Sequence, residues 1–402
     1  MARSKILMAC SNYWTSPFNV GSHHWAREFV SRGYEVAYIS DPISPMHVLG
    51  SRSLEWKERR RIYDLGGLKQ NDGLLWAYVP GTLASPHPQP LLRSPWLHRN
   101  WFRMTRPSIL PYVQHQGFGK VDLLYIDSLV QSFWLGRIEA KKTLFRMTDD
   151  LPSLDKATPS FAKVERELIQ QADAVTYTSR VLEKKIFPLK PKRTFYVPAG
   201  VHLKDFAVSE SRILPDEYKK IPKPIAVYVG SIGSRFDDQL LSLTARRLPK
   251  VSFVLIGPEK EARQKLPNLS NLYLLGTKPY DSIPPYLWNA ALGLIPLNVR
   301  CNPGLVHSTH PLKLYQYLAC GLPVVSTDWE TIRDLHSPAL LSRNFEGFVK
   351  NIKTALDQPK PVRNNIRFAR KHEWKNRLKE IFYWLEEASS TVRQVRAGKG
   401  SK

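Results

Sequence analysis

The chain alternates short apolar runs with helical segments, and this alternation occurs twice. The first apolar run, residues 6–10, leads through a polar loop to a segment with apolar residues at helical spacing, and the run 34–40 follows. The second half begins in the same way, with apolar runs at 225–229 and 251–256 on either side of a glycine loop and a helical segment. Parallel strands need crossover segments between them, so these units predict parallel sheets covered by helices. We therefore expect two α/β domains.

Length and composition agree with two folded domains. A chain of 402 residues exceeds what one core normally holds, and a hydrophobic fraction of 43% argues against extensive disorder. No apolar run reaches the roughly 18 residues that a membrane-spanning helix needs. The N-terminal run is predicted to be a strand rather than a signal peptide. The cysteines Cys10, Cys301 and Cys320 lack metal-ligand spacing, which favours a reducing compartment and predicts neither a disulfide framework nor a zinc site.

The chain is strongly basic, with 59 Lys and Arg against 35 Asp and Glu, a net charge of +24. Such a charge attracts polyanions. Nucleic acid, an anionic membrane surface and phosphate-bearing substrates are the candidate partners, and charge alone does not choose among them.

Composition also predicts the domain boundaries. The segment 205–222 is charged and proline-rich, as a linker should be. The first domain is therefore expected over 1–205, with a basic and aromatic insertion at 51–120. The second domain is expected over 206–365. Residues 366–402 are predicted to form an amphipathic helix followed by a basic tail.

Small and polar residues follow the predicted strands of the second half. In chain order they are Gly230, Ser231, Gly257, Gly276, Thr277 and Lys278, followed by the segment 298–313. Ligands of open α/β sheets bind at these strand ends, and helix N-termini offer free N–H groups to phosphates. Lys313 lies in the first turn of the next helix and would add a cation, whereas Gln316, one turn later, would reach a pair of hydroxyls. The alternative is a surface lysine and an exposed glutamine.

A pair of carboxylates ends a strand of the first half. Asp149 is the last residue of the predicted strand 143–149, directly after the residues Arg-Met-Thr, and a carboxylate there suits a general base that deprotonates an acceptor hydroxyl. Asp150 precedes Leu-Pro-Ser and is the better capping candidate. The alternative is that one of the pair caps the next turn or helix.

Histidines lie beside both candidate loops. His23 and His24 open the first predicted helix and are candidates to contact the acceptor or a donor phosphate. His307 and His310 flank the loop of the second half. For each of these residues the alternative is a histidine on a helix surface.

The segment 91–106 interleaves aromatic and basic residues. Its apolar members are Trp96, Leu97, Trp101 and Phe102, and its arginines are Arg93, Arg99, Arg103 and Arg106. This pattern suits an interface with anionic lipids. One alternative is a solvated charged face with a few buried tryptophans. The other is a nucleic-acid groove, which ranks last because no known nucleic-acid motif accompanies the segment.

Consecutive blocks of the second half resemble a known family. YVGSIGSRFDDQLL, VSFVLIGP, NLYLLGTKPYDSIPPYL, GLIPL and HPLKLYQYLACGLPVVST resemble the bacterial group 1 (GT4-like) glycosyltransferases of the GT-B fold, in family order and spacing over residues 225–330. In the first half, LFRMTDD, AVTYTSRVLEKKI and VPAGVHLKDF are similar to segments of the same family. The first half is also similar to teichuronic-acid transferases and to the glucuronosyltransferase of xanthan assembly.

The resemblance implies an α/β protein of GT-B fold, with two Rossmann-like domains facing a cleft and a last helix, near 374–388, that returns to the first domain. It implies transfer of a sugar from a nucleotide sugar, expected to be UDP-linked with UDP-glucuronate as a candidate. The acceptor would be lipid-diphosphate-linked or a glycan, in bacterial surface polysaccharide synthesis. The protein would then be cytoplasmic and peripheral on the inner face of the plasma membrane, with no nucleic-acid partner.

This chain departs from the family pattern at three positions. Most relatives bind the ribose hydroxyls with a glutamate where this chain has Gln316, and an amide lacks charge assistance. Ser308 lies where the E-x7-E pattern has its first glutamate, and Ser231 where many relatives have an arginine. The phosphate charge then depends mainly on Lys313.

Lys278 or Arg235 is expected to help Lys313. No metal or other cofactor is expected, because cations and helix dipoles neutralise the leaving diphosphate in GT-B enzymes. A general base implies inversion at the anomeric carbon, but many relatives are retaining, so both outcomes stay open. Two rival functions also stay open. One is a nucleotide-sugar epimerase of GT-B fold, and the other is a basic RNA- or membrane-binding protein with a degenerate donor site.

Overall fold

A computed structural model describes residues 3–45, 54–86, 92–150, 159–207, 213–301 and 303–387. The chain divides into two compact units. The first comprises Met1–Ser16, Val20–Val197 and Leu378–Lys402, and the second comprises Pro17–Asn19 and Pro198–Arg377.

The change of unit falls a few residues before the expected boundary at 205. The short helix α8 (Leu203–Phe206) explains this difference. Phe206 is fully buried, and its carbonyl accepts a hydrogen bond of 3.1 Å from the indole Nε1 of Trp288 in the second unit. The chain is therefore already part of the second unit before the charged linker begins.

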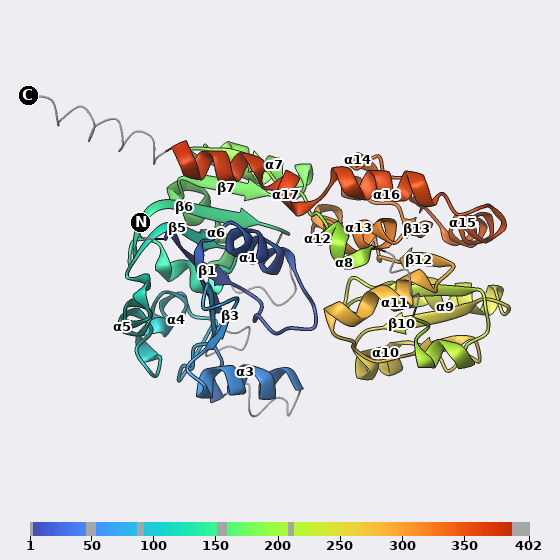
Figure 1. The fold of residues 1–402 in the computed structure, drawn as a ribbon, viewed down its shortest axis with the longest axis horizontal. Coiled ribbons are helices and arrows are strands. Elements are labelled where there is room, and N and C mark those ends of the chain that lie inside the picture. Colours follow the sequence, from blue (N-terminus) through green and yellow to red (C-terminus); the bar gives the residue numbers. More distant parts are fainter. Residues whose placement is uncertain are drawn as a thin grey trace, which may run out of the picture. The chain divides into compact units, whose positions relative to one another are not determined.

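The first unit is built on an eight-stranded sheet with the order β3-β4-β2-β1-β5-β6-β7-β8 (Figure 1). Its strands are β1 (Lys5–Cys10), β2 (Glu35–Ser40), β3 (Leu68–Gln70), β4 (Leu75–Tyr78), β5 (Lys120–Ile126), β6 (Glu139–Met147), β7 (Ala174–Tyr177) and β8 (Thr194–Tyr196). All neighbours are parallel except β3 and β4. The predicted first strand and the strands predicted near 121–127 and 143–149 are confirmed as β1, β5 and β6.

Helices connect these strands. They are α1 (Gly21–Ser31), α3 (Leu54–Asp64), α4 (Pro95–Asn100), α5 (Ile109–Val113), α6 (Pro159–Gln171) and α7 (Glu183–Ile186). Helix α1 buries Trp25 and Phe29, which are four residues apart and so lie on one helical face. Helical residues 379–387 pack on the same unit, where the ring of Phe382 lies 5.8 Å from that of Phe29. The basic tail predicted beyond them lies outside the described residues.

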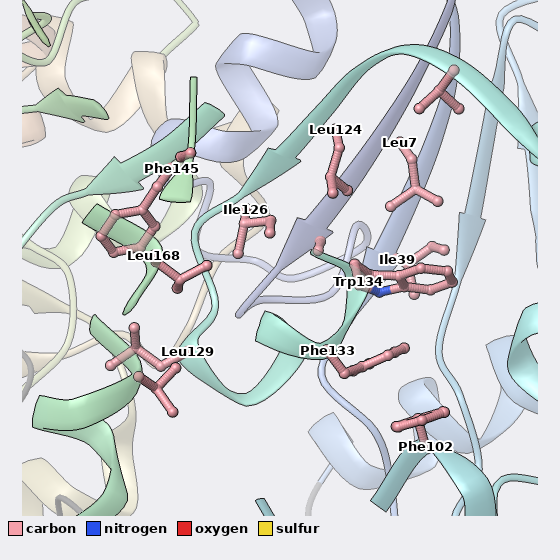
Figure 2. Close-up of a cluster of buried hydrophobic side chains, with 14 of the residues drawn as sticks. Leu7, Ile39, Phe102, Leu124, Ile126, Leu129, Phe133, Trp134, Phe145 and Leu168 are labelled. Carbon is pink, nitrogen blue, oxygen red and sulfur yellow. The ribbon is translucent and has the colours of Figure 1, made fainter. Parts of the chain in front are cut away.

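The core of the first unit includes side chains from the segment predicted to meet a membrane (Figure 2). The ring of Phe102 stacks on Phe133 at 4.7 Å, and Trp101 meets Phe133 edge-on at 5.1 Å. Leu97 is also buried, whereas Trp96 is 64% exposed. The prediction that these apolar side chains face a lipid surface is therefore wrong for three of the four. Their burial fits the alternative, a charged face above buried aromatic residues.

The second unit has a six-stranded sheet in which every neighbouring pair is parallel. Its strands are β9 (Ile225–Val229), β10 (Ser252–Ile256), β11 (Leu272–Leu274), β12 (Leu292–Ile295), β13 (Val324–Thr327) and β14 (Leu340–Ser342). The order β11-β10-β9-β12-β13-β14 is that of a Rossmann fold, which reverses between its first and fourth strands. The expected α/β class is confirmed, and the reversal marks a ligand position at the carboxyl ends of β9 and β12.

Helix α13 (Leu312–Ala319) is fixed beside this reversal. A Cβ on Gly293 of β12 would lie 2.3 Å from the ring of Tyr317, so glycine allows the helix to approach the sheet. The hydroxyl of Tyr317 accepts a hydrogen bond of 2.8 Å from the backbone N–H of Val229. Helix α13 is thus held against the end of β9.

The remaining helices of this unit are α9 (Asp238–Arg247), α10 (Glu259–Lys265), α11 (Ile283–Trp288), α12 (Pro303–Ser308), α14 (Glu330–Asp334), α15 (Phe345–Asp357), α16 (Val362–Lys371) and α17 (Trp374–Arg377). Within the described ranges of either unit, no helix is both long enough and apolar enough to cross a membrane.

Candidate functional site

A glycine loop follows β9 at the sheet reversal. Gly230 has a φ of +143°, a region that favours glycine, and its N–H donates to the carbonyl of Ile256 at 2.9 Å. A Cβ on Gly257 would lie 2.2 Å from the carbonyl oxygen of Gly230. Only glycine fits at residue 257 without moving this loop. Two backbone segments therefore lie close together at this strand end.

The amine of Lys313 lies beneath this loop. Its Nζ donates a hydrogen bond of 3.1 Å to the hydroxyl of Tyr228 and lies 4.3 Å from the centroid of that ring. A Cβ on Gly230 would lie 2.9 Å from Nζ, so the ammonium and the glycine are neighbours. Burial of the amine, and then the positive charge of Arg235, lower the pKa of Lys313 to about 7.

Arg235 and Ser231 complete this cluster. The guanidinium of Arg235 donates to the hydroxyl of Thr309 at 3.1 Å, which ties it to the segment before α13. Ser231 is exposed, and its carbonyl accepts a hydrogen bond of 2.5 Å from Tyr228. The structure thus brings together five predicted donor-site residues: Gly230, Ser231, Arg235, Gly257 and Lys313.

Gln316 lies one turn after Lys313 on α13 and is half-buried. Its side-chain amide makes no hydrogen bond to another residue that the structure describes, so both its donors and its acceptor are available to a ligand. Ser308 is fully buried instead, and its hydroxyl donates to the carbonyl of Leu305 at 3.0 Å. Of the two positions where relatives have glutamate, only residue 316 offers a side chain to a ligand.

Lys278 does not join the cluster. Its amine forms an ion pair of 2.7 Å with Glu217, whose carboxylate also accepts hydrogen bonds from Tyr286. The hydrogen bond to Glu217 raises the pKa of Lys278. The charge expected to help Lys313 is therefore balanced within the protein, and Arg235 is the helper that the structure places nearby.

The two aspartates after β6 have different surroundings. Asp150 is buried and forms an ion pair with Lys185 of α7. Asp149 is half-buried and follows the strand end by two residues. The turn that Asp150 was predicted to cap begins at residue 151, outside the described residues. The ion pair gives Asp150 a structural role, whereas Asp149 keeps the more open position.

The paired histidines of α1 are buried. The Nδ1 of His23 accepts a hydrogen bond of 3.2 Å from the N–H of Val20, so its Nε2 carries the proton that is donated to the carbonyl of Tyr13 at 3.0 Å. Burial lowers the pKa of His23 to about 4, which keeps the ring neutral. His24 is equally buried. Burial contradicts the helix-surface alternative for both histidines. The predicted ligand contact of His23 stays a prediction, and in this structure both of its ring nitrogens have backbone partners.

The histidines near the second loop also have protein partners. His307 accepts a hydrogen bond of 3.4 Å from the N–H of Glu330, and His310 shares a hydrogen bond of 2.9 Å with the hydroxyl of Tyr315. These contacts orient the ends of α12 and α13 around the loop.

Sequence reasoning missed a buried polar group at the strand ends of the first unit. Asp41 follows β2, Asp127 follows β5 and Arg146 lies in β6, and these strands lie close together in the sheet around β1. Asp127 and Arg146 are both 5% exposed, with 4.0 Å between their charged atoms. Burial raises the pKa of Asp41 to about 7. The hydroxyl of Ser128 donates a hydrogen bond of 2.5 Å to the carboxylate, and this bond acts in the opposite direction. Their position directly after the apolar runs was the signal that could have identified the two aspartates.

Two families match this chain, one for each half. Residues 8–178 match the family described as "Glucuronosyltransferase GumK, N-terminal domain". Residues 223–358 match the family described as "Glycosyl transferases group 1".

Individual proteins are similar to this chain in sequence or in fold. A putative teichuronic acid biosynthesis glycosyltransferase, TuaH, of Bacillus subtilis (strain 168) is 24% identical over 234 residues, which are 54% of this chain and 57% of that protein. The match thus spans little more than half the length of the curated relative. The structure of sucrose-phosphate synthase from Thermosynechococcus elongatus superposes with a TM-score of 0.65 at 15% identity, covering 98% of this chain and all of that one. Anabaena HepE in complex with UDP and glucose superposes at 0.62 and 14% identity, over 96% of this chain and all of the other.

The fold is that of the GT-B glycosyltransferase structures, and the matches define one class, because each half of the chain is similar to a glycosyltransferase family. Within that class, the predicted resemblance to the bacterial group 1 enzymes is confirmed, and the first half is similar to the N-terminal domain of a glucuronosyltransferase.

Proposed function

We propose that this protein transfers a sugar from a nucleotide sugar, and that the second unit binds the nucleotide. The observation that carries the proposal is the position of Lys313 beside Gly230, at the carboxyl end of β9 where the sheet order reverses. A diphosphate needs a cation and accessible backbone, and this strand end supplies both.

The chemistry follows from where charge develops. When the sugar leaves, negative charge builds up on the diphosphate, and fixed cations stabilise it without reorganising. Lys313 and Arg235 would supply the positive charge, and Gln316 would hydrogen-bond the ribose hydroxyls. This scheme assigns the stabilisation to the chain's own residues and includes no metal.

The finer assignments rest on similarity. The HepE structure was obtained with UDP, which supports UDP as the nucleotide, and the GumK-type first half supports glucuronate as the sugar. The name of the Bacillus relative supports a role in a bacterial surface polysaccharide, with a lipid-linked or glycan acceptor bound by the first unit. The net charge of +24 supports a peripheral position on the anionic inner face of the plasma membrane.

The general base of this scheme is Asp149. It stands at the carboxyl end of a first-unit strand, which is where ligands of such sheets bind, and it is more open than Asp150. A base that deprotonates the acceptor hydroxyl goes with inversion at the anomeric carbon.

The test is a calorimetric titration of the whole protein with UDP, GDP and dTDP, in parallel with Lys313→Met. We expect one nucleotide to bind and the variant to bind it roughly ten- to a hundredfold more weakly, the cost of a lost charge-assisted hydrogen bond. Lys350, an exposed lysine of α15, provides the matched control as Lys350→Met. Equal affinity in wild type and Lys313→Met would refute the site, and binding of none of the three would favour a non-catalytic protein. Analysis of products without acceptor separates transfer from epimerisation.

A further inference from the structure

Tyr228 joins the two parts of the candidate phosphate site. It lies in the central strand β9, two residues before Gly230, and is 1% exposed. Its hydroxyl donates one hydrogen bond, to the carbonyl of Ser231 at 2.5 Å, and accepts another, from Nζ of Lys313 at 3.1 Å. A single oxygen atom thus connects the glycine loop to the first turn of α13.

The ring of Tyr228 also packs against its neighbours. It meets the ring of Phe236 edge-on at 4.8 Å, on the way to α9. The Nζ of Lys313 lies 4.3 Å from the ring centroid, within the range of a cation–π contact. Both the hydroxyl and the ring face of Tyr228 therefore act on the same ammonium group.

The position of Lys313 depends on this contact, because a lysine has a long and flexible stem. The titratable groups that face its amine are Tyr228 and Arg235. No carboxylate of a described residue forms an ion pair with the amine. A carboxylate would hold the ammonium but cancel its charge, whereas a hydroxyl and a ring hold it and leave the charge for a ligand.

We propose that Tyr228 is a positioning residue for the transfer of the sugar. Its side chain holds the ammonium of Lys313 and the Gly230–Ser231 loop in the geometry that accepts the diphosphate of the nucleotide sugar. This inference rests on the proposed function, because it needs a diphosphate at this site. The inference goes beyond the proposed function because it assigns the arrangement of Lys313 and the glycine loop to a tyrosine that does not itself touch the ligand.

The experiment compares Tyr228→Phe with wild type by calorimetric titration with UDP-glucose. The substitution keeps the ring and removes both hydrogen bonds, so we expect affinity to fall roughly five- to tenfold. Tyr273→Phe, on the half-buried strand β11, is the matched control and should bind like wild type. Urea unfolding of each variant checks that the fold is intact.

Two readouts separate positioning from general stability. In Tyr228→Phe the charged amine loses an acceptor, so the pH at which affinity falls should move to lower values, which a merely structural loss would not cause. The double variant Tyr228→Phe/Lys313→Met should lose less affinity than the two single losses combined, because part of the effect of the tyrosine passes through the lysine.

The outcomes distinguish the two proposals. If wild type binds UDP-glucose and Tyr228→Phe matches it in affinity and in pH dependence, the role of Tyr228 is refuted while the donor site stands. Additive losses in the double variant would also refute it. If wild type binds no nucleotide sugar, the proposed function fails, and the positioning role fails with it because there is no diphosphate to receive.

Discussion

The affinity for a nucleotide sugar should depend on pH through one lysine. The pKa of Lys313 is lowered from its ordinary value of 10.5 to about 7, chiefly by burial. A bound diphosphate favours the charged ammonium, because it replaces the water that burial removed with a nearby negative charge. UDP-glucose is the right probe, since its diphosphate has no group that titrates near neutrality.

The size of the effect follows from the pKa. At about pH 6 roughly nine in ten molecules carry a charged Lys313, and at about pH 8 roughly one in eleven does. If only the charged form binds the diphosphate well, the dissociation constant should rise roughly tenfold between these values, which is about 1.4 kcal/mol. The sign is fixed: affinity is complete below the pKa of the free protein and is lost as the pH rises through it.

Calorimetric titration at a series of pH values measures this change. Repeating the titration near pH 8 in buffers of different ionisation enthalpy should show uptake of almost one proton for each nucleotide bound. Lys313→Met should bind weakly with no such dependence. A wild-type affinity that stays constant over this range, with no proton uptake, would show that Lys313 is charged throughout and that burial does not control it.

Three further substitutions test the surrounding structure. Gly257→Ala should cost about 1–3 kcal/mol in urea unfolding, because its Cβ would lie 2.2 Å from a backbone carbonyl, whereas Gly233→Ala, whose Cβ would have its nearest neighbour at 3.4 Å, should cost little; equal stabilities would contradict the packing argument. Asp149→Asn should abolish sugar transfer, measured by nucleotide release with acceptor, and leave UDP binding unchanged; retained turnover would remove it as the base. Lys185→Met should lower stability by about 1 kcal/mol by leaving buried Asp150 without its ion-pair partner, a modest cost because the lysine is 40% exposed; no loss on thermal unfolding would show that the carboxylate is solvated instead.

Much of the architecture could be predicted from the sequence, because the signal for it is local. Apolar residues recur with the period of a strand or a helix, and the runs at 6–10 and 225–229 formed the central strands of their sheets. Residues after parallel strands must gather at one edge, so the glycines at 230 and 257 and the lysine at 313 could be assigned to one site.

The partners of polar and aromatic side chains were decided only by the tertiary structure. Lys278 pairs with Glu217, which is 61 residues away, and Lys313 meets Tyr228 across 85 residues. Pairings between residues so far apart leave no periodic pattern in the sequence. A lysine at a strand end therefore looks the same in the sequence whether a ligand or a carboxylate balances its charge.

Burial was decided in the same way. The alternation of aromatic residues and arginines near Trp101 is compatible with a lipid surface and with a core. The packing of Phe133 against Trp101 and Phe102 shows that these side chains belong to the core. The sequence by itself determined the two βα units and which residues gather at the strand end that we propose as the phosphate site. Tertiary structure decided which side chains remain available there, because that depends on contacts between residues far apart in the chain.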